Sequence, residues 1–266
     1  MGAVKKHGEA PYRVAVVHGG PGAAGEMAPV ARALAAEHGV LEPHQSATSV
    51  TGQIDELAAA LQALGSPSVT LVGFSWGAWL SFLLASHMPS LVEKLILIGC
   101  PPFEESYASR IHEARLRRLS EEERRELERL TAVLNGAKGK DRDAALTRIG
   151  QLTAKAEAYN AAPEPSPMVD CQAEVFLSVW EEAAALRRSG QLLARARDIA
   201  CPVVALHGDH DPHPAAGVEE PLSRLLPDFR FVPLARCGHK PWIEIEARDA
   251  FFHALRREIG HPSYGG

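Results

Sequence analysis

Short apolar runs rich in β-branched residues recur along the chain, and each is separated from the next by segments with helical spacing. Such runs are typical of buried strands. They cover residues 13–17, 69–72, 95–98, 203–206 and 229–232. A shorter run, Val40-Leu41, is at most a short strand. Because strands alternate with helices, the pattern predicts βαβ units and an α/β fold with a mostly parallel sheet and helices on both faces.

The helices are predicted from apolar residues spaced three and four positions apart. Met27, Val30, Ala31 and Leu34 form the first such stripe, and Gly39 follows where that helix should end. Further stripes predict helices within residues 54–64, 127–134, 176–183 and 245–255. Residues 78–85 are apolar on nearly every side, which predicts a buried helix.

Residues 103 to about 198 differ in composition from the segments on either side. They contain no convincing strand and carry many charged residues. Ser120 and Glu123 have the spacing of a capping box at the start of a helix. We therefore expect an α/β core formed by residues 1–102 and 199–266, with residues 103–198 inserted as a helical lid.

The run at residues 69–72 leads directly into Gly73-Phe74-Ser75-Trp76-Gly77 and then into an apolar helix. A strand that turns at once into a helix holds its middle residue on a tight, strained turn, with the side chain clear of the sheet. Free backbone N–H groups and the positive end of the helix dipole then lie beside the hydroxyl. Ser75 is therefore the candidate nucleophile.

A serine hydroxyl needs a base within hydrogen-bond reach, and the base needs an acid that orients it. In a parallel sheet, the loops that follow the strands gather at one edge. Asp211 follows the strand at 203–206, and His239 follows the strand at 229–232. We expect His239 to act as the base and Asp211 as the acid, with Asp209 as the second choice for the acid.

These motifs, in this order, resemble those of the α/β-hydrolase superfamily along nearly the whole chain. The matching segments are Gly73–Gly77, Gly208-x-x-Asp211, Gly238-His239-x-Pro241-Trp242-x-Glu244 and His18-Gly19-Gly20-Pro21-Gly22. The resemblance implies the α/β-hydrolase fold, with residues 103–198 as its helical cap. It also implies an oxyanion hole formed by the backbone N–H groups of Gly20 and Trp76. The implied reaction is hydrolysis of an ester, amide or related acyl substrate through an acyl-enzyme, without a cofactor.

The His-Gly-Gly-Pro-Gly loop and the tryptophan after Ser75 are also similar to prolyl aminopeptidases, which hold a substrate amine with cap carboxylates. Glu181 is the candidate for such a substrate-binding residue, and a solvent-facing acid is the alternative. Two features differ from those enzymes. The loop from Glu42 to Ala47 lacks their Asp-rich, Arg-Gly pattern, and only about a dozen residues precede the first expected strand, so no leading hairpin is expected. A small acyl compound and a short peptide both remain open as substrates.

Three alternative functions fit parts of the sequence. The segment from Gly20 to Gly25 is a G-x-G-x-x-G with Glu42 further on, as in dinucleotide-binding folds, although Pro21 removes a phosphate-binding N–H. A hydrolase fold without catalysis, used to bind a small molecule, is the second alternative, and the intact serine, aspartate and histidine argue against it. A metal site is the third. Its ligands would be His207, Asp209, His210, Asp211 and His213. No matching second cluster exists, and we expect no metal.

Composition narrows the class of protein. A chain of 266 residues, 46% hydrophobic and 23% charged, suits one large globular α/β domain. The net charge of −5 argues against a nucleic-acid partner. The four cysteines are scattered without a C-x-x-C motif, which indicates a reducing compartment. With neither a signal peptide nor an apolar run of about 18 residues, a cytoplasmic protein without membrane contact is expected.

Overall fold

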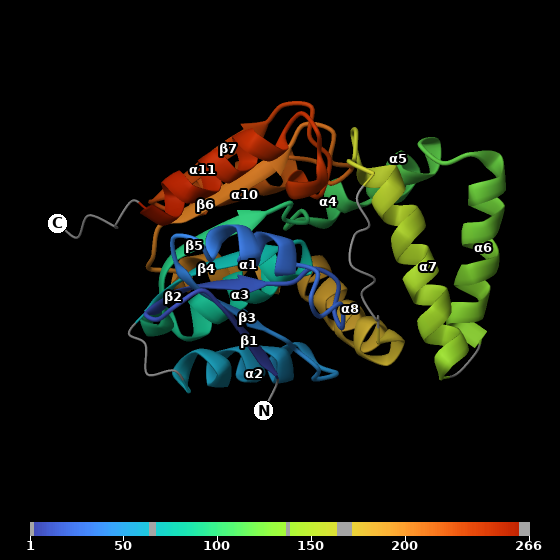
Figure 1. Cartoon of the computed structure of the whole chain (residues 1–266). Coiled ribbons are helices and arrows are strands. Elements are labelled where there is room, and N and C mark those ends of the chain that lie inside the picture. Colours follow the sequence, from blue (N-terminus) through green and yellow to red (C-terminus); the bar gives the residue numbers. More distant parts are fainter. Residues whose placement is uncertain (1–2, 64–67, 137–138, 164–171, 261–266) are drawn as a thin grey trace.

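The computed structural model describes residues 3–63, 68–136, 139–163 and 172–260. In this part of the chain, seven strands form one sheet in the order β1-β3-β2-β4-β5-β6-β7 (Figure 1). All neighbouring strands run parallel except β1 and β3, so the predicted mostly parallel sheet is confirmed. The strands are β1 Val4–His7, β2 Tyr12–Val17, β3 Gly39–Pro43, β4 Val69–Phe74, β5 Val92–Ile98, β6 Val203–Gly208 and β7 Phe229–Leu234.

Helices cover both faces of the sheet because the central strands bury side chains on both faces. In β4, Leu71 belongs to one apolar core and Val72 to the other, since successive side chains of a strand point to opposite faces. The helices on the Val72 face are α1 Ala28–Leu34 and α11 Arg248–Gly260. The helices on the Leu71 face include α2 Val50–Gln62, α3 Trp76–His87 and α10 Ala216–Leu225.

The sheet begins one strand earlier than the sequence pattern predicted. β1 pairs antiparallel with β3 and has no buried residue, which explains why it lacks an apolar run. β3 is also longer than Val40-Leu41, and all five of its residues are buried. Its Glu42 accepts a hydrogen bond from His7 of β1 at 2.8 Å, so a polar residue is accommodated inside the sheet. The expectation that the first strand starts at residue 13 is therefore wrong.

Between β5 and β6 the described residues are mainly helical, and we call residues 103–198 the helical insertion. α6 and α7 form a hairpin that projects from the body of the molecule (Figure 1). The capping box at its start is present: Ser120 N–H donates to Glu123, and Glu123 N–H donates to the Ser120 hydroxyl. The helices are α4 Glu105–Ala108, α5 Ile111–Arg117, α6 Glu121–Gly136, α7 Lys140–Glu157, α8 Ala173–Arg188 and α9 Gln191–Ala194.

α8 packs against the helices on the Leu71 face of the sheet. The ring of its Trp180 stacks on Trp79 of α3 with a centroid distance of 5.9 Å. Trp79 is fully buried and belongs to the core on the Leu71 face of the sheet. None of the described helices is both long and apolar enough to cross a membrane.

The strand ends that carry the sequence motifs lie at one edge of the sheet. In the sheet register, Gly73 of β4 is opposite Val17 of β2, and Phe74 is opposite Ile98 of β5. The last residues of β6 and β7, Gly208 and Leu234, are also paired. The loops after β2, β4, β6 and β7 therefore leave the sheet on the same side.

Candidate active site

Ser75 occupies the turn between β4 and α3. Its φ of 52° lies in the left-handed region that residues with a side chain rarely adopt, and its hydroxyl does not cap the helix. A Cβ at Gly73 would overlap the backbone of Gly77, and a Cβ at Gly77 would overlap the carbonyl oxygens of Val17 and His18. Both flanking positions therefore require glycine, and the start of α3 lies against the loop that follows β2.

The two expected oxyanion donors lie on these adjoining segments. Trp76 is the first residue of α3, so its N–H has no carbonyl partner one helical turn earlier. Gly20 is half-buried and follows β2 by three residues. A Cβ at Gly19 would lie 2.8 Å from the ring of Phe74, so this loop packs closely on the strand that carries Ser75. The backbone N–H groups of Gly20 and Trp76 are thus candidates for a shared anion site.

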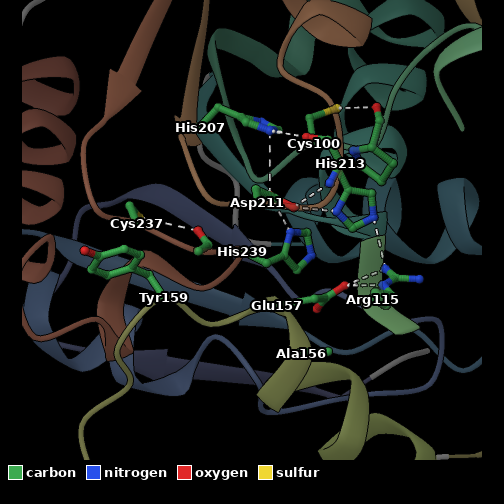
Figure 2. A network of polar contacts seen from close by, with 12 residues as sticks. Cys100, Arg115, Ala156, Glu157, Tyr159, His207, Asp211, His213, Cys237 and His239 are labelled. Carbon is green, nitrogen blue, oxygen red and sulfur yellow. Dashed lines mark hydrogen bonds and ion pairs between the residues drawn. The ribbon is translucent and has the colours of Figure 1, made fainter. Parts of the chain in front are cut away.

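Asp211 and His239 come together in the loops after β6 and β7 (Figure 2). Nδ1 of His239 lies 2.7 Å from Oδ2 of Asp211, and both side chains are buried. Asp209, the second choice for the acid, has a different role. It accepts the backbone N–H groups of Arg236 and Cys237 at 3.0 and 3.1 Å, and so fixes the turn before His239.

The environment of this pair favours a charged carboxylate and a basic imidazole. Burial alone would raise the pKa of Asp211, but the surrounding histidines hold that pKa well below its ordinary value. Burial would likewise lower the pKa of His239, but the carboxylates of Asp211 and Glu157 outweigh burial and raise it above its ordinary value. These are the properties needed in an acid that orients a general base.

His239 also packs beside the turn of Ser75. Its ring centroid lies 4.9 Å from that of Phe74, and a Cβ at Gly99 would lie 3.0 Å from its Nδ1. The N–H of Ser75 donates to the carbonyl of Ile98, immediately before that glycine, at 2.9 Å. Within the described residues, no hydrogen bond joins the Ser75 hydroxyl to His239. Hydrogen bonds of this kind commonly tighten only when substrate binds.

Glu244 fastens the loop of His239 to the helical insertion. Its carboxylate is fully buried and accepts the backbone N–H groups of Gly238, Tyr159 and Asn160 at 2.9, 2.9 and 2.7 Å. The sequence motif of the histidine loop contains this glutamate, but the pattern alone gave no reason to assign it this role. The base loop and the end of α7 therefore form one hydrogen-bonded unit.

Two residues of the helical insertion, neither of them predicted from the sequence, also reach this site. Nε of Arg115, in α5, donates to the carboxylate of Glu157 at 2.8 Å, and Glu157 is buried at the end of α7. The backbone carbonyl of Glu157 accepts the N–H of His239 at 3.1 Å. Both residues belong to strongly charged helices, where the same residue types are usually exposed, so no local signal distinguishes them.

The histidines around Asp211 are held by hydrogen bonds within the chain. Glu157, His213 and His239 each place one atom that could bind a metal within 4.8 Å of the others. This set differs from the loop residues that the sequence suggested as metal ligands. Arg115 already donates to Glu157 and to His213, the latter at 3.2 Å, and Asp211 holds Nδ1 of both imidazoles. The positive charge beside Glu157 and His213 is thus the guanidinium of Arg115.

Glu181 and Glu42 are the two remaining acids with a role predicted from the sequence. Glu181 is exposed on α8 and makes no hydrogen bond or ion pair among the residues described, so its substrate-binding role stays a prediction. Its neighbour Glu182 accepts the N–H of Val50 at the start of α2, at 2.8 Å. Glu42 is fully buried and bound to His7, so it is not free to bind the ribose of a dinucleotide.

Comparison with known proteins identifies relatives at the level of the fold. A family model described as the alpha/beta hydrolase fold matches residues 12–244. The search of curated proteins gives no match.

Several solved structures superpose on nearly the whole chain. VinJ has a TM-score of 0.67 and 19% sequence identity, covering 96% of this chain and 93% of its own. E-2-(Acetamidomethylene)succinate hydrolase has a TM-score of 0.64 and 19% identity, covering 97% and 94%. The enol-lactonase from Burkholderia xenovorans LB400 has a TM-score of 0.62 and 18% identity, covering 97% and 96%. At these identities the similarity concerns the fold.

Proposed function

The chain belongs to the α/β-hydrolase fold family, and we propose that it is a serine hydrolase acting on carboxylic esters or lactones. One observation carries the proposal. The buried hydrogen bond of 2.7 Å between Asp211 and His239 lies at the sheet edge where Ser75 stands on a turn with positive φ. A nucleophile on a strained turn, together with a buried acid–imidazole pair, is the arrangement that acyl transfer requires.

In the proposed mechanism, the Ser75 hydroxyl attacks the substrate carbonyl carbon while His239 takes the hydroxyl proton. Asp211 keeps the imidazole in the tautomer that can accept this proton and stabilises the resulting imidazolium. The N–H groups of Gly20 and Trp76 bind the oxyanion, each contributing about 3 kcal/mol in the transition state. His239 then gives its proton to the leaving alcohol. Water attacks the acyl-enzyme with His239 again as base, which releases the acid and regenerates the serine.

The environments of Glu157, Glu181 and Glu182, three of the acids in the helical insertion, favour a neutral acyl substrate over a peptide with a free amine. Binding an amine would require carboxylates without other partners. Glu157 is already bound by Arg115, and Glu182 is bound by the N–H of Val50. Glu181 is exposed. An enol-lactonase among the structural neighbours acts on a substrate of the proposed class.

The test is hydrolysis of a p-nitrophenyl ester chain-length series and a lactone, with proline p-nitroanilide beside them. The wild type and Ser75→Ala are compared. We expect ester or lactone turnover that falls by at least about a thousandfold in the variant. Faster cleavage of the proline anilide would instead support an aminopeptidase. A folded wild type that turns over none of these compounds would favour the small-molecule-binding alternative.

A further inference from the structure

Asp211 binds two imidazoles at equal distance. Its Oδ2 lies 2.7 Å from Nδ1 of His239, and its Oδ1 lies 2.7 Å from Nδ1 of His213. Figure 2 shows both rings directed at the one carboxylate, and their centroids are 4.4 Å apart. An ionised carboxylate favours a proton on any imidazole beside it. On these distances alone, His213 would compete with His239 for the proton that the reaction moves.

Arg115 makes the two rings different. Its Nη2 lies 3.2 Å from Nε2 of His213. A guanidinium can only donate, so this nitrogen of His213 accepts with its lone pair, and the ring proton is at Nδ1, facing Asp211. A second proton at Nε2 would break the hydrogen bond and set an imidazolium against the guanidinium. His213 is thereby held as a neutral donor.

Glu157 favours the other ring. It binds the guanidinium of Arg115 at 2.8 Å, and its carboxylate lies within 4.8 Å of a ring nitrogen of His239. The pKa of His239 is raised because Asp211 and Glu157 outweigh burial. The pKa of His213 is lowered by burial, and the charges of His239 and Arg115 add to this against the attraction of Asp211. The two histidines thus shift in opposite directions although they share one carboxylate.

The other polar groups around Asp211 do not favour a proton on His213. Nε2 of His207 lies 2.8 Å from the backbone carbonyl of His213, to which it donates. Arg118 adds positive charge near Asp211 and Glu157. Burial raises the pKa of the Cys100 thiol well above its ordinary value, so this residue is neutral.

We propose that the Arg115–Glu157 ion pair directs the catalytic proton to His239 and excludes it from His213. The inference rests on the proposed hydrolase function. It makes Arg115, Glu157 and His213 positioning residues, which act on the reaction through Asp211 and His239. Because α5 and α7 supply the ion pair, the helical insertion takes part in the acid–base chemistry of the core.

The kinetic test removes the ion pair as a unit. Arg115→Met/Glu157→Gln leaves no buried charge without a partner. We expect kcat/KM at neutral pH to fall about tenfold or more, since one pKa unit changes the distribution of a proton between two sites by that factor. Adding His213→Asn should restore most of the loss, because the amide N–H can still donate to Asp211 but cannot take a second proton.

The matched control for the kinetic test is Arg117→Met/Glu113→Gln, which removes an exposed ion pair from the same helix. This variant should keep wild-type kcat/KM. A loss of activity in the control as large as in the buried pair would overturn the proposal, and so would failure of His213→Asn to restore activity.

A second measurement follows each ring without turnover. NMR titration of protein labelled with ¹⁵N-histidine should show His239 binding its proton at higher pH than His213 in the wild type. In Arg115→Met/Glu157→Gln, the two titrations should move toward each other. An unchanged order and separation would overturn the proposal. If the titrations behave as expected but no ester is hydrolysed, the proton assignment stands and the proposed hydrolase function fails.

Discussion

Replacing Asp211 by asparagine should invert the hydrogen bond that orients His239. In the wild type, Oδ1 of Asp211 accepts both Nδ1 and the backbone N–H of His213, at 2.7 and 2.9 Å, while Oδ2 accepts His239. The single oxygen of the amide will therefore take the position of Oδ1, because there it can accept both N–H groups of His213. Its NH₂ group then faces His239, whose Nδ1 must accept, so the ring proton moves to Nε2 and no lone pair is left for Ser75.

The expected cost follows from this wrong tautomer. Where an acid-to-amide change of this kind leaves the geometry intact, kcat falls by about 10⁴, which corresponds to about 5 kcal/mol of transition-state stabilisation. The assay is steady-state hydrolysis of the best ester substrate by Asp211→Asn, with circular dichroism and thermal unfolding to verify that the variant is folded.

Asp209→Asn is the matched control, since it makes the same chemical change two residues away in the same loop. Asp209 accepts two backbone N–H groups, one on each oxygen, and the amide can keep only one of them. We expect a stability cost of about 1–3 kcal/mol and kcat within about tenfold of the wild type. Asp211 does not orient His239 in this way if Asp211→Asn keeps more than about a tenth of the wild-type kcat, or if both variants lose activity equally.

Three further changes test the packing of the core and the charge beside His239. Gly77→Ala should lower the free energy of unfolding in urea by about 2 kcal/mol or more, because the added methyl overlaps the backbone oxygens of Val17 and His18. An unchanged midpoint would contradict this close packing. Glu157→Gln should move the acidic limb of the kcat/KM profile to lower pH. The base His239 must be unprotonated to act, and its pKa is raised by the carboxylate that this change removes. A shift to higher pH would show that Glu157 does not raise the pKa of His239. Trp79→Ala should cost about 3–5 kcal/mol in the same unfolding assay, since the fully buried ring is lost, and a cost below about 1 kcal/mol would argue against its core position.

The parallel part of the sheet was predictable because its signals are local. β4 carries an apolar, β-branched run, and the glycine-bounded turn after it leads directly into a helix. β1 carries no such signal. Lys5 and Lys6 of this strand are exposed, and its place in the sheet depends on pairing with β3, a segment more than 30 residues away in the chain. An edge strand of this kind is defined by its neighbour more than by its own composition.

In the candidate site, the sequence was enough to predict that the loops of Ser75, Asp211 and His239 meet at one edge of the sheet, because each follows a strand of a parallel sheet. The ion pair of Arg115 and Glu157 could not be found in this way. The two residues are 42 positions apart, and their burial depends on how α5 and α7 pack against the loops of the core. In the sequence, neither residue differs from the other charged residues of its helix.

The proposed mechanism depends on Ser75 being an activated nucleophile. Covalent labelling by a fluorophosphonate probe tests it most directly, with the modified peptide located by mass spectrometry in the wild type and in Ser75→Ala. We expect labelling of the peptide that contains Ser75, and no labelling of the folded variant. A folded wild type that does not react with the probe, or a variant that reacts equally well, would contradict it.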